Sequence, residues 1–168
     1  MHLNDELMIK KQLEPGHEVA LSLLLTREHL ARLFEETVFK QEDITDQQFN
    51  VLRILKGGPA EGYLIRDIRK RMIYRNADVP RLVDRLVKQG LVERKECAHD
   101  RRGCMVFLTL KGNQLQERIR PRHDELCRNL DRVLSIPEHQ VLLDLLERLR
   151  DDFRTQLTPA PNARGGKI

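Results

Sequence analysis

The chain of 168 residues lacks several features that would place it in common protein classes. It has no Trp, only 4% aromatic residues, and three Cys, an odd number whose spacing predicts no disulfide framework. It contains no apolar run of about eighteen residues, and its first residues lack the apolar segment and cleavage site of a signal peptide. We therefore expect a cytoplasmic protein with reduced thiols and no membrane partner.

Motifs typical of enzymes are also missing. There is no Ser-His-Asp signature, no phosphate-binding Gly loop and no zinc-protease motif, so we expect no catalytic activity. Cys97, His99 and Cys104 are three potential zinc ligands, but a fourth is lacking and the spacing matches no common finger. Cys97 and Cys104 could instead oxidise across a hairpin, or they are two small residues in β-strands. We predict no metal site and no cofactor.

One stretch combines a clear helical pattern with a polar, largely basic surface. Its apolar residues recur three to four positions apart, which predicts a helix that buries one stripe. The stripe consists of Val79, Leu82, Val83, Leu86 and Val87. Asn76 or Asp78 can cap the start of this helix, Pro80 is tolerated in its first turn, and Gly90 suits a left-handed C-terminal cap.

Two segments rich in β-forming residues follow this helix, 91–95 and 105–109. The residues between them, 98–103, are polar, basic and end in Gly, which predicts a β-hairpin with a basic tip. A second short helix is expected over 64–72, and a turn over 73–75 joins the two helices. Helix, turn, helix and basic hairpin together predict a winged helix-turn-helix.

A set of residues at fixed spacings runs through this stretch. It comprises Arg81-Leu82-Val83-Asp84-Arg85-Leu86, Gly90-Leu91-Val92-Glu93-Arg94, Asp100, Arg102, Val106, Leu108, Thr109 and Gly112. With this set the chain resembles the MarR family of winged-helix transcription regulators, and a looser resemblance extends from about residue 15 to about residue 157. Ile73 and Pro80 depart from the pattern, because the family often has Gly and a small polar residue there.

The charge distribution agrees with a DNA-binding role. Between Arg66 and Lys111 there are 13 Lys or Arg and 6 Asp or Glu, a net charge of +7, although the whole chain carries only +4. A basic excess confined to one motif is the electrostatic footprint of a protein that binds a phosphate backbone. A solvated charged surface is the simpler explanation, but it does not account for the coincidence with the motif.

The predicted second helix and the hairpin supply the candidate DNA contacts. We assign base contacts to Asp78, Pro80 and Arg81 near the N-terminal end of the helix. Arg85 is expected to hold a phosphate, or to pair with Asp84 or another acid. The remaining candidates are Arg75 and Asn76, which would touch phosphate where the helix begins, and Arg101 and Arg102 at the hairpin tip. Asp100 is expected to brace the tip.

Long amphipathic helices are predicted on both sides of this unit. One covers 17–41, a second begins near Thr45, and two more follow after Thr109 and Ser135, with a kink or local break at Pro121. Cys127 is expected in the core. We divide the chain into a flexible N-terminus or short helix (1–15), a DNA-binding domain (44–110), a helical dimerisation region (16–43 and 111–157) and a disordered tail (158–168).

The predicted fold class is mainly α with a small β-hairpin wing, a winged helix-turn-helix with long N- and C-terminal dimerisation helices. The apolar stripes of those helices need a cover, which is either a second subunit or one another within a monomer. The resemblance implies interlocked termini in a homodimer that reads a pseudo-palindromic operator in double-stranded DNA. It also implies a repressor that a small, often aromatic or phenolic, effector releases from DNA by binding between the dimer helices and the winged unit. Two alternatives are a cysteine redox or metal sensor on this scaffold and a winged-helix protein-interaction module without DNA binding.

Overall fold

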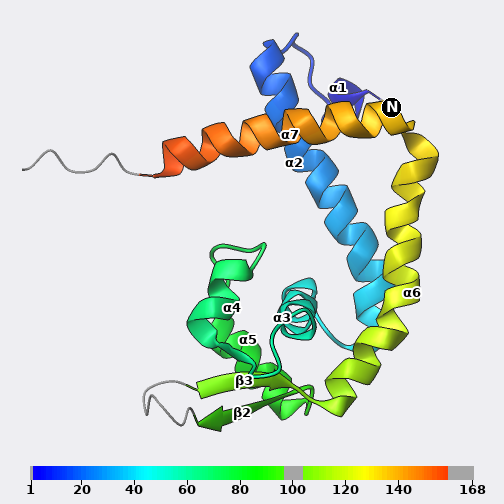
Figure 1. The fold of residues 1–168 in the computed structure, drawn as a ribbon. Helices are drawn as coiled ribbons and strands as arrows, with labels where there is room; N and C mark the ends of the chain where they lie inside the picture. Colours follow the sequence, from blue (N-terminus) through cyan, green and yellow to red (C-terminus); the bar gives the residue numbers. More distant parts are fainter. Residues whose placement is uncertain (1, 97–103, 159–168) are drawn as a thin grey trace, which may run out of the picture. The chain divides into compact units, whose positions relative to one another are not determined.

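The structure, a computed structural model, describes residues 2–96 and 104–158 (Figure 1). It forms two compact units, Met1–Asp124 and Glu125–Ile168, whose boundary falls inside helix α6 (Leu110–Val133) shortly after Pro121. Helix α6 continues through Pro121, so the local break predicted there does not occur. No helix of these two described ranges combines the length and apolar character that a membrane span requires.

The first unit begins with helices that are mostly exposed. A four-residue helix, α1 (Leu3–Glu6), precedes α2 (Pro15–Phe34), whose first residue is Pro, a residue suited to that position. Helix α2 runs on into a π-helical turn, η1 (Glu35–Phe39), and a 3-10 turn, η2 (Lys40–Glu42). The predicted helix over 17–41 is therefore confirmed, with an irregular last part that sequence periodicity did not reveal.

Helix α3 (Asp46–Lys56) starts at the cap predicted from the sequence. The Gln48 backbone N–H donates to Thr45 Oγ1 at 3.2 Å, and the Thr45 N–H donates to Gln48 Oε1 at 2.9 Å. This reciprocal pair satisfies two backbone donors that a helix start leaves without partners. Most of α3 is buried at the centre of the first unit, including Phe49, Val51 and Leu52.

The helix-turn-helix consists of α4 (Ile65–Arg71) and α5 (Val79–Lys88), both close to the predicted ranges. Asp78 Oδ1 caps α5 by accepting the Arg81 N–H at 3.2 Å. At the other end Gly90 has φ +71°, and Leu91 N and Gly90 N donate to the carbonyls of Leu86 and Val87, both at 2.9 Å. Only a residue that tolerates positive φ closes a helix in this way, so Gly90 fixes where α5 ends.

A three-stranded antiparallel sheet completes the winged unit. Strands β2 (Val92–Glu96) and β3 (Cys104–Leu108) form the predicted hairpin, with Val92 opposite Leu108 and Glu96 opposite Cys104. Strand β1 (Tyr63–Leu64), which the sequence analysis missed, pairs with the other side of β3 in the order β1-β3-β2. Two residues are too few to show an alternation of apolar and polar side chains in the sequence. Strand β1 is recognised only by its pairing with β3.

Helix α6 starts against the end of this sheet. Thr109 Oγ1 accepts the Gly112 N–H at 3.0 Å, which confirms the predicted cap, and lies 2.8 Å from the Gly90 carbonyl oxygen. A Cβ on Gly112 would lie 2.1 Å from the Leu91 carbonyl oxygen. The start of α6 can approach Leu91, the residue before β2, this closely only because residue 112 is glycine.

The second unit contains the end of α6 and helix α7 (Ile136–Leu157). Ser135 N and Oγ donate to Glu138 Oε2 at 2.7 and 2.6 Å, so the predicted start of α7 is confirmed. No residue of α7 is buried in the single chain. Cys127 is exposed, and the expectation that it belongs to a core is wrong, because its helix has no cover on that side in one chain.

Candidate nucleic-acid interface and ligand cavity

Helix α5 separates its apolar and charged residues as the sequence predicts. Val79, Val83 and Leu86 are fully buried, whereas Arg81 and Arg85 are exposed one turn apart. Val87, which was assigned to the buried stripe, is 38% exposed because it lies at the end of the helix and at the edge of the stripe. The exposed surface of α5 therefore presents two guanidinium groups in a position from which they can reach a partner.

The residues around the start of α5 have structural contacts of their own. Asp78 is exposed, but its carboxylate caps the helix. Arg75 Nη1 donates to the Lys70 carbonyl at 2.9 Å and so satisfies an acceptor at the C-terminal end of α4. Asn76 and Pro80 are exposed beside them. These contacts position the predicted site residues, and their DNA contacts remain predictions.

Arg94, which the sequence analysis did not select, joins the hairpin to α5. Its Nη2 lies 2.7 Å from Asp84 Oδ1 and 3.4 Å from the Pro80 carbonyl oxygen. Asp84 is thus the partner of Arg94 and not of Arg85, for which pairing with Asp84 was one alternative. Arg85 forms no ion pair with any other residue of the described ranges, so its guanidinium is available.

The predicted hairpin tip, 98–103, falls outside the described residues. Arg101, Arg102 and the proposed brace Asp100 lie outside the described residues, as do Cys97 and His99. Cys104 begins β3 and is exposed. Within residues 2–96 and 104–158, no group of three or more His, Cys, Asp or Glu side chains could hold a metal ion.

The first unit also contains a cavity of about 260 Å³ between α2, η1, α3, the α4–α5 turn and α6. It is lined by Arg27, Leu30, Ala31, Phe34, Phe39, Asp46, Phe49, Asn50, Arg53, Ile73, Tyr74 and His123. Apolar walls with a few polar groups are typical of small-molecule sites. None of these residues was selected as a ligand contact from the sequence. The sequence feature that could have indicated the cavity is Asn50, a polar residue in the otherwise apolar run of α3.

Aromatic rings form one wall of this cavity. The His123 ring centroid lies 5.1 Å from that of Phe34 and 5.5 Å from that of Phe49, and the Phe39 and Phe49 centroids are 5.2 Å apart. Phe34 and Phe39 stack at 6.1 Å although they are five residues apart. The wider π-helical turn of η1 brings them onto the same side, and such turns are frequent at functional sites.

The side chains that line the cavity include both basic and acidic groups. Arg27 and Arg53 are cationic, and Asp46 accepts a hydrogen bond from the Tyr74 hydroxyl. Burial raises the pKa of Asp46 above its ordinary value, the nearby Glu35 raises it further, and Arg27 and His123 oppose the shift. A planar molecule with one negative charge would find both a stacking wall and positive partners here.

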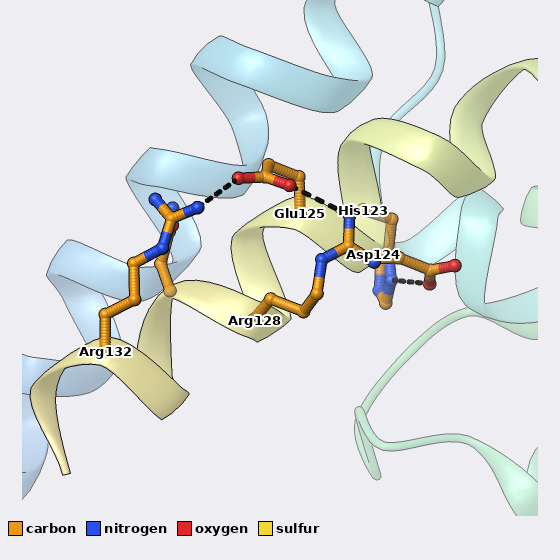
Figure 2. A network of polar contacts seen from close by, with 6 residues as sticks. His123, Asp124, Glu125, Arg128 and Arg132 are labelled. Atoms are coloured by element: carbon orange, nitrogen blue, oxygen red, sulfur yellow. Dashed lines mark hydrogen bonds and ion pairs between the residues drawn. The ribbon is translucent and has the colours of Figure 1, made fainter.

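Beyond His123, helix α6 carries exposed ion pairs. Figure 2 shows the Glu125 carboxylate between Arg128 and Arg132, with N···O distances of 2.8 and 3.0 Å. The pKa of the Glu125 carboxyl lies below its usual range, mainly because of the hydrogen bond from Arg128 and then because of the positive charges of Arg128 and Arg132. In the same figure His123 Nδ1 lies 3.7 Å from Asp124. Exposed pairs of this kind add little stability, so we assign them no role in the site.

Comparisons with known proteins agree with this geometry. The sequence profile of the MarR family matches residues 42–103. The chain is 29% identical over 131 residues to the HTH-type transcriptional regulator FarR of Neisseria gonorrhoeae, an alignment that covers 78% of this chain and 88% of FarR.

Two solved structures share both the fold and part of the sequence. The PcaV transcriptional regulator of Streptomyces coelicolor, in complex with its natural ligand, has a TM-score of 0.68 and 26% identity, over 84% of this chain and 97% of PcaV. A mutant MarR of Escherichia coli complexed with operator DNA has a TM-score of 0.67 and 28% identity, over 82% of this chain and 99% of MarR. One of these structures holds a ligand and the other holds DNA.

Proposed function

Because this chain belongs to the MarR family of winged helix-turn-helix regulators, we propose that it is a transcriptional regulator that binds operator DNA as a homodimer. The observation that carries the proposal is α5 with its exposed Arg81 and Arg85, which we call the recognition helix, beside the hairpin wing. The operator complex of MarR supports this use of the fold. We assign the chain no catalytic activity and infer that it acts in the cytoplasm, on chromosomal DNA.

Exposed apolar side chains support the dimer. Neither α2 nor α7 has a buried residue, although the two helices have 20 and 22 residues. The large apolar side chains that they expose include Val19, Leu24, Leu33, Leu142, Leu145 and Phe153. A monomer rarely leaves the apolar side chains of two long helices exposed, so we propose that a second copy covers them. Two recognition helices related by a two-fold axis would then read a pseudo-palindromic site.

The cavity supports regulation by a small molecule. Its aromatic wall, Arg27 and Arg53 suit an aromatic carboxylate, and the PcaV structure contains a ligand in the same fold. We propose that such a ligand releases the protein from DNA, which makes it a repressor whose genes are induced by the ligand.

Selection of bound duplexes from a random pool tests the DNA-binding proposal. We expect a pseudo-palindrome with half-sites about one DNA turn apart. Binding to that duplex should weaken steeply with salt, because each neutralised phosphate contributes about −0.9 to the slope of log affinity against log salt. Recovery of no enriched sequence from a folded sample would contradict the proposal.

A further inference from the structure

We propose that Asp46 and Asn50 couple the cavity to the recognition helix, because each holds one of two consecutive residues in the turn before α5. The inference rests on the proposed function and assigns its regulation to particular hydrogen bonds. Asp46 and Asn50 are positioning residues for α5, and both also line the cavity.

Two hydrogen bonds connect α3 to the turn. Asn50 Oδ1 accepts the Ile73 backbone N–H at 3.0 Å, and the Tyr74 hydroxyl donates to Asp46 Oδ2. Asp46 and Asn50 are four residues apart on α3, so they lie on the same side of that helix. The cavity is therefore bounded by the side chains that fix Ile73 and Tyr74.

The turn also has contacts of its own, among them the hydrogen bond from Arg75 to the Lys70 carbonyl and the Asp78 cap of α5. It links α4, which ends at Arg71, to α5, which begins at Val79. The Tyr74 carbonyl accepts the Ala77 N–H at 3.2 Å, so the position of Tyr74 is passed directly to the last residues before α5. A shift of Ile73 and Tyr74 would therefore move the N-terminal end of the recognition helix, where base contacts are expected.

Asn50 has a donor without a partner in the part of the chain that the structure describes, and this residue lines the cavity. Its side chain is 2% exposed, and its Nδ2 has no hydrogen-bond partner among the described residues. A buried amide donor without a partner is costly, and a ligand oxygen in the cavity would satisfy it. A ligand bound to Nδ2 would thus pull on the same side chain that holds Ile73 through Oδ1.

Asp46 responds to charge in the cavity. Arg27 from α2 and His123 from α6 favour its ionised form, whereas Glu35 from η1 opposes it. A ligand carboxylate that binds Arg27 would remove that support and add a repulsive charge. The Asp46 carboxylate would then become a weaker acceptor for the Tyr74 hydroxyl, and the turn would lose the second of its two hydrogen bonds to α3.

The two tyrosines of the chain provide a matched test. Tyr74→Phe removes the hydroxyl that donates to Asp46, and Tyr63→Phe removes the other tyrosine hydroxyl while keeping the ring under Arg71. We would measure operator affinity with and without saturating 4-hydroxybenzoate, an aromatic carboxylate with a second polar group. We expect a loss of affinity of at least about fivefold in the wild type and in Tyr63→Phe, and less than half of that loss in Tyr74→Phe.

A ligand-free arm uses a second matched pair. Asn50→Leu and Gln116→Leu each remove a buried amide whose nitrogen lacks a partner in the described ranges, but only Asn50 holds the turn and lines the cavity. Asn50→Leu should weaken operator binding several-fold without ligand, whereas Gln116→Leu should not. Circular dichroism and the midpoint of thermal unfolding establish that each variant is folded.

The outcomes separate this inference from the proposed function. If the wild type binds no duplex, the proposed function fails. If it binds DNA but not 4-hydroxybenzoate, the ligand class is wrong, and the ligand-free arm still decides the coupling. If Tyr74→Phe responds to ligand as the wild type does, or if Asn50→Leu and Gln116→Leu bind DNA equally well, the coupling through Asp46 and Asn50 is wrong.

Discussion

The Arg94 guanidinium on β2 lies 2.7 Å from the Asp84 carboxylate on the recognition helix, and 3.4 Å from the Pro80 carbonyl of the same helix. Arg94 therefore contacts the first turn of α5 and a position one turn further along. This side chain joins the first strand of the wing to the recognition helix. Both elements are proposed to touch the same DNA, so their relative placement decides whether they can bind together.

Asp84→Asn should weaken operator binding although it removes a negative charge. If net charge alone mattered, this change would strengthen binding to phosphate. We expect the opposite, because Arg94 loses its partner and the wing is no longer fixed to α5. Because the Arg94–Asp84 pair is partly exposed, it contributes only about 0.2–1 kcal/mol to the stability of the fold.

Glu93→Gln is the control for this prediction. Glu93 is an acidic residue of β2 that pairs at 2.7 Å with Lys95 on its own strand, so its loss changes charge without freeing the wing. Fluorescence anisotropy on one labelled operator compares the two variants at equal salt. Stronger binding by Asp84→Asn, equal to that of Glu93→Gln, would show that the pair has no positioning role.

Arg81→Ala should relax sequence preference. Arg81 is exposed in the first turn of α5, where a guanidinium can reach the two acceptors of guanine in the major groove. A good bidentate contact discriminates between bases by roughly 1–3 kcal/mol. The affinities of wild type and variant for operator and scrambled duplex give the answer. An equal loss on both duplexes would mean that Arg81 contacts only phosphate.

Local patterns predicted the elements well. The stripe of α5, the caps at Thr45, Thr109 and Ser135, and the end of α5 at Gly90 each depend on residues within a few positions of one another. They follow from neighbouring residues, whatever the rest of the chain does. The predicted helices and the hairpin therefore differ from the structure mainly at their ends.

Contacts between distant segments were not predictable in this way. The partner of Asp84 is Arg94 because β2 turns back toward α5, and the cavity exists because α2, α3, the α4–α5 turn and α6 meet. The exposure of Cys127 shows the same limit, since apolar spacing says that a stripe needs a cover but not which chain supplies it. The sequence thus indicated the proposed DNA-binding surface and, through the resemblance, the region of an effector site, but none of the residues that line the cavity.

The protein should be a dimer at micromolar concentration. Burying side chains such as Leu142, Leu145 and Phe153 is worth about 1.5–3 kcal/mol each, and each is exposed in the single chain. Light scattering should give twice the chain mass of 19.7 kDa. Leu145→Glu would place a charge in the proposed interface and should shift the mass toward the monomer. A folded wild-type monomer at this concentration would contradict the proposed homodimer.

Asp46→Asn should stabilise the protein near neutral pH. Burial and Glu35 raise the pKa of Asp46, so the folded state favours the protonated carboxyl. The stability that this group contributes is complete below the ordinary Asp pKa and is lost as the pH rises through the raised pKa. The variant should therefore exceed the wild type in urea unfolding at pH 7.5, and the gap should close in acid. A less stable variant at pH 7.5 would mean that the charge at the start of α3 is favourable.

Replacing Arg101 and Arg102 together by Ala should flatten the salt dependence of DNA binding. The basic excess of +7 between Arg66 and Lys111 motivates this prediction, and both residues belong to the predicted wing tip. Each phosphate contact contributes about −0.9 to the slope of log affinity against log salt, and a dimer presents two copies of each residue. The slope should fall by at most about four contacts, and by less if one Arg pairs with Asp100. Circular dichroism first confirms that the double variant folds, and titrations at several salt concentrations on one fluorescent duplex then give both slopes. Coinciding slopes would show that the wing does not touch phosphate.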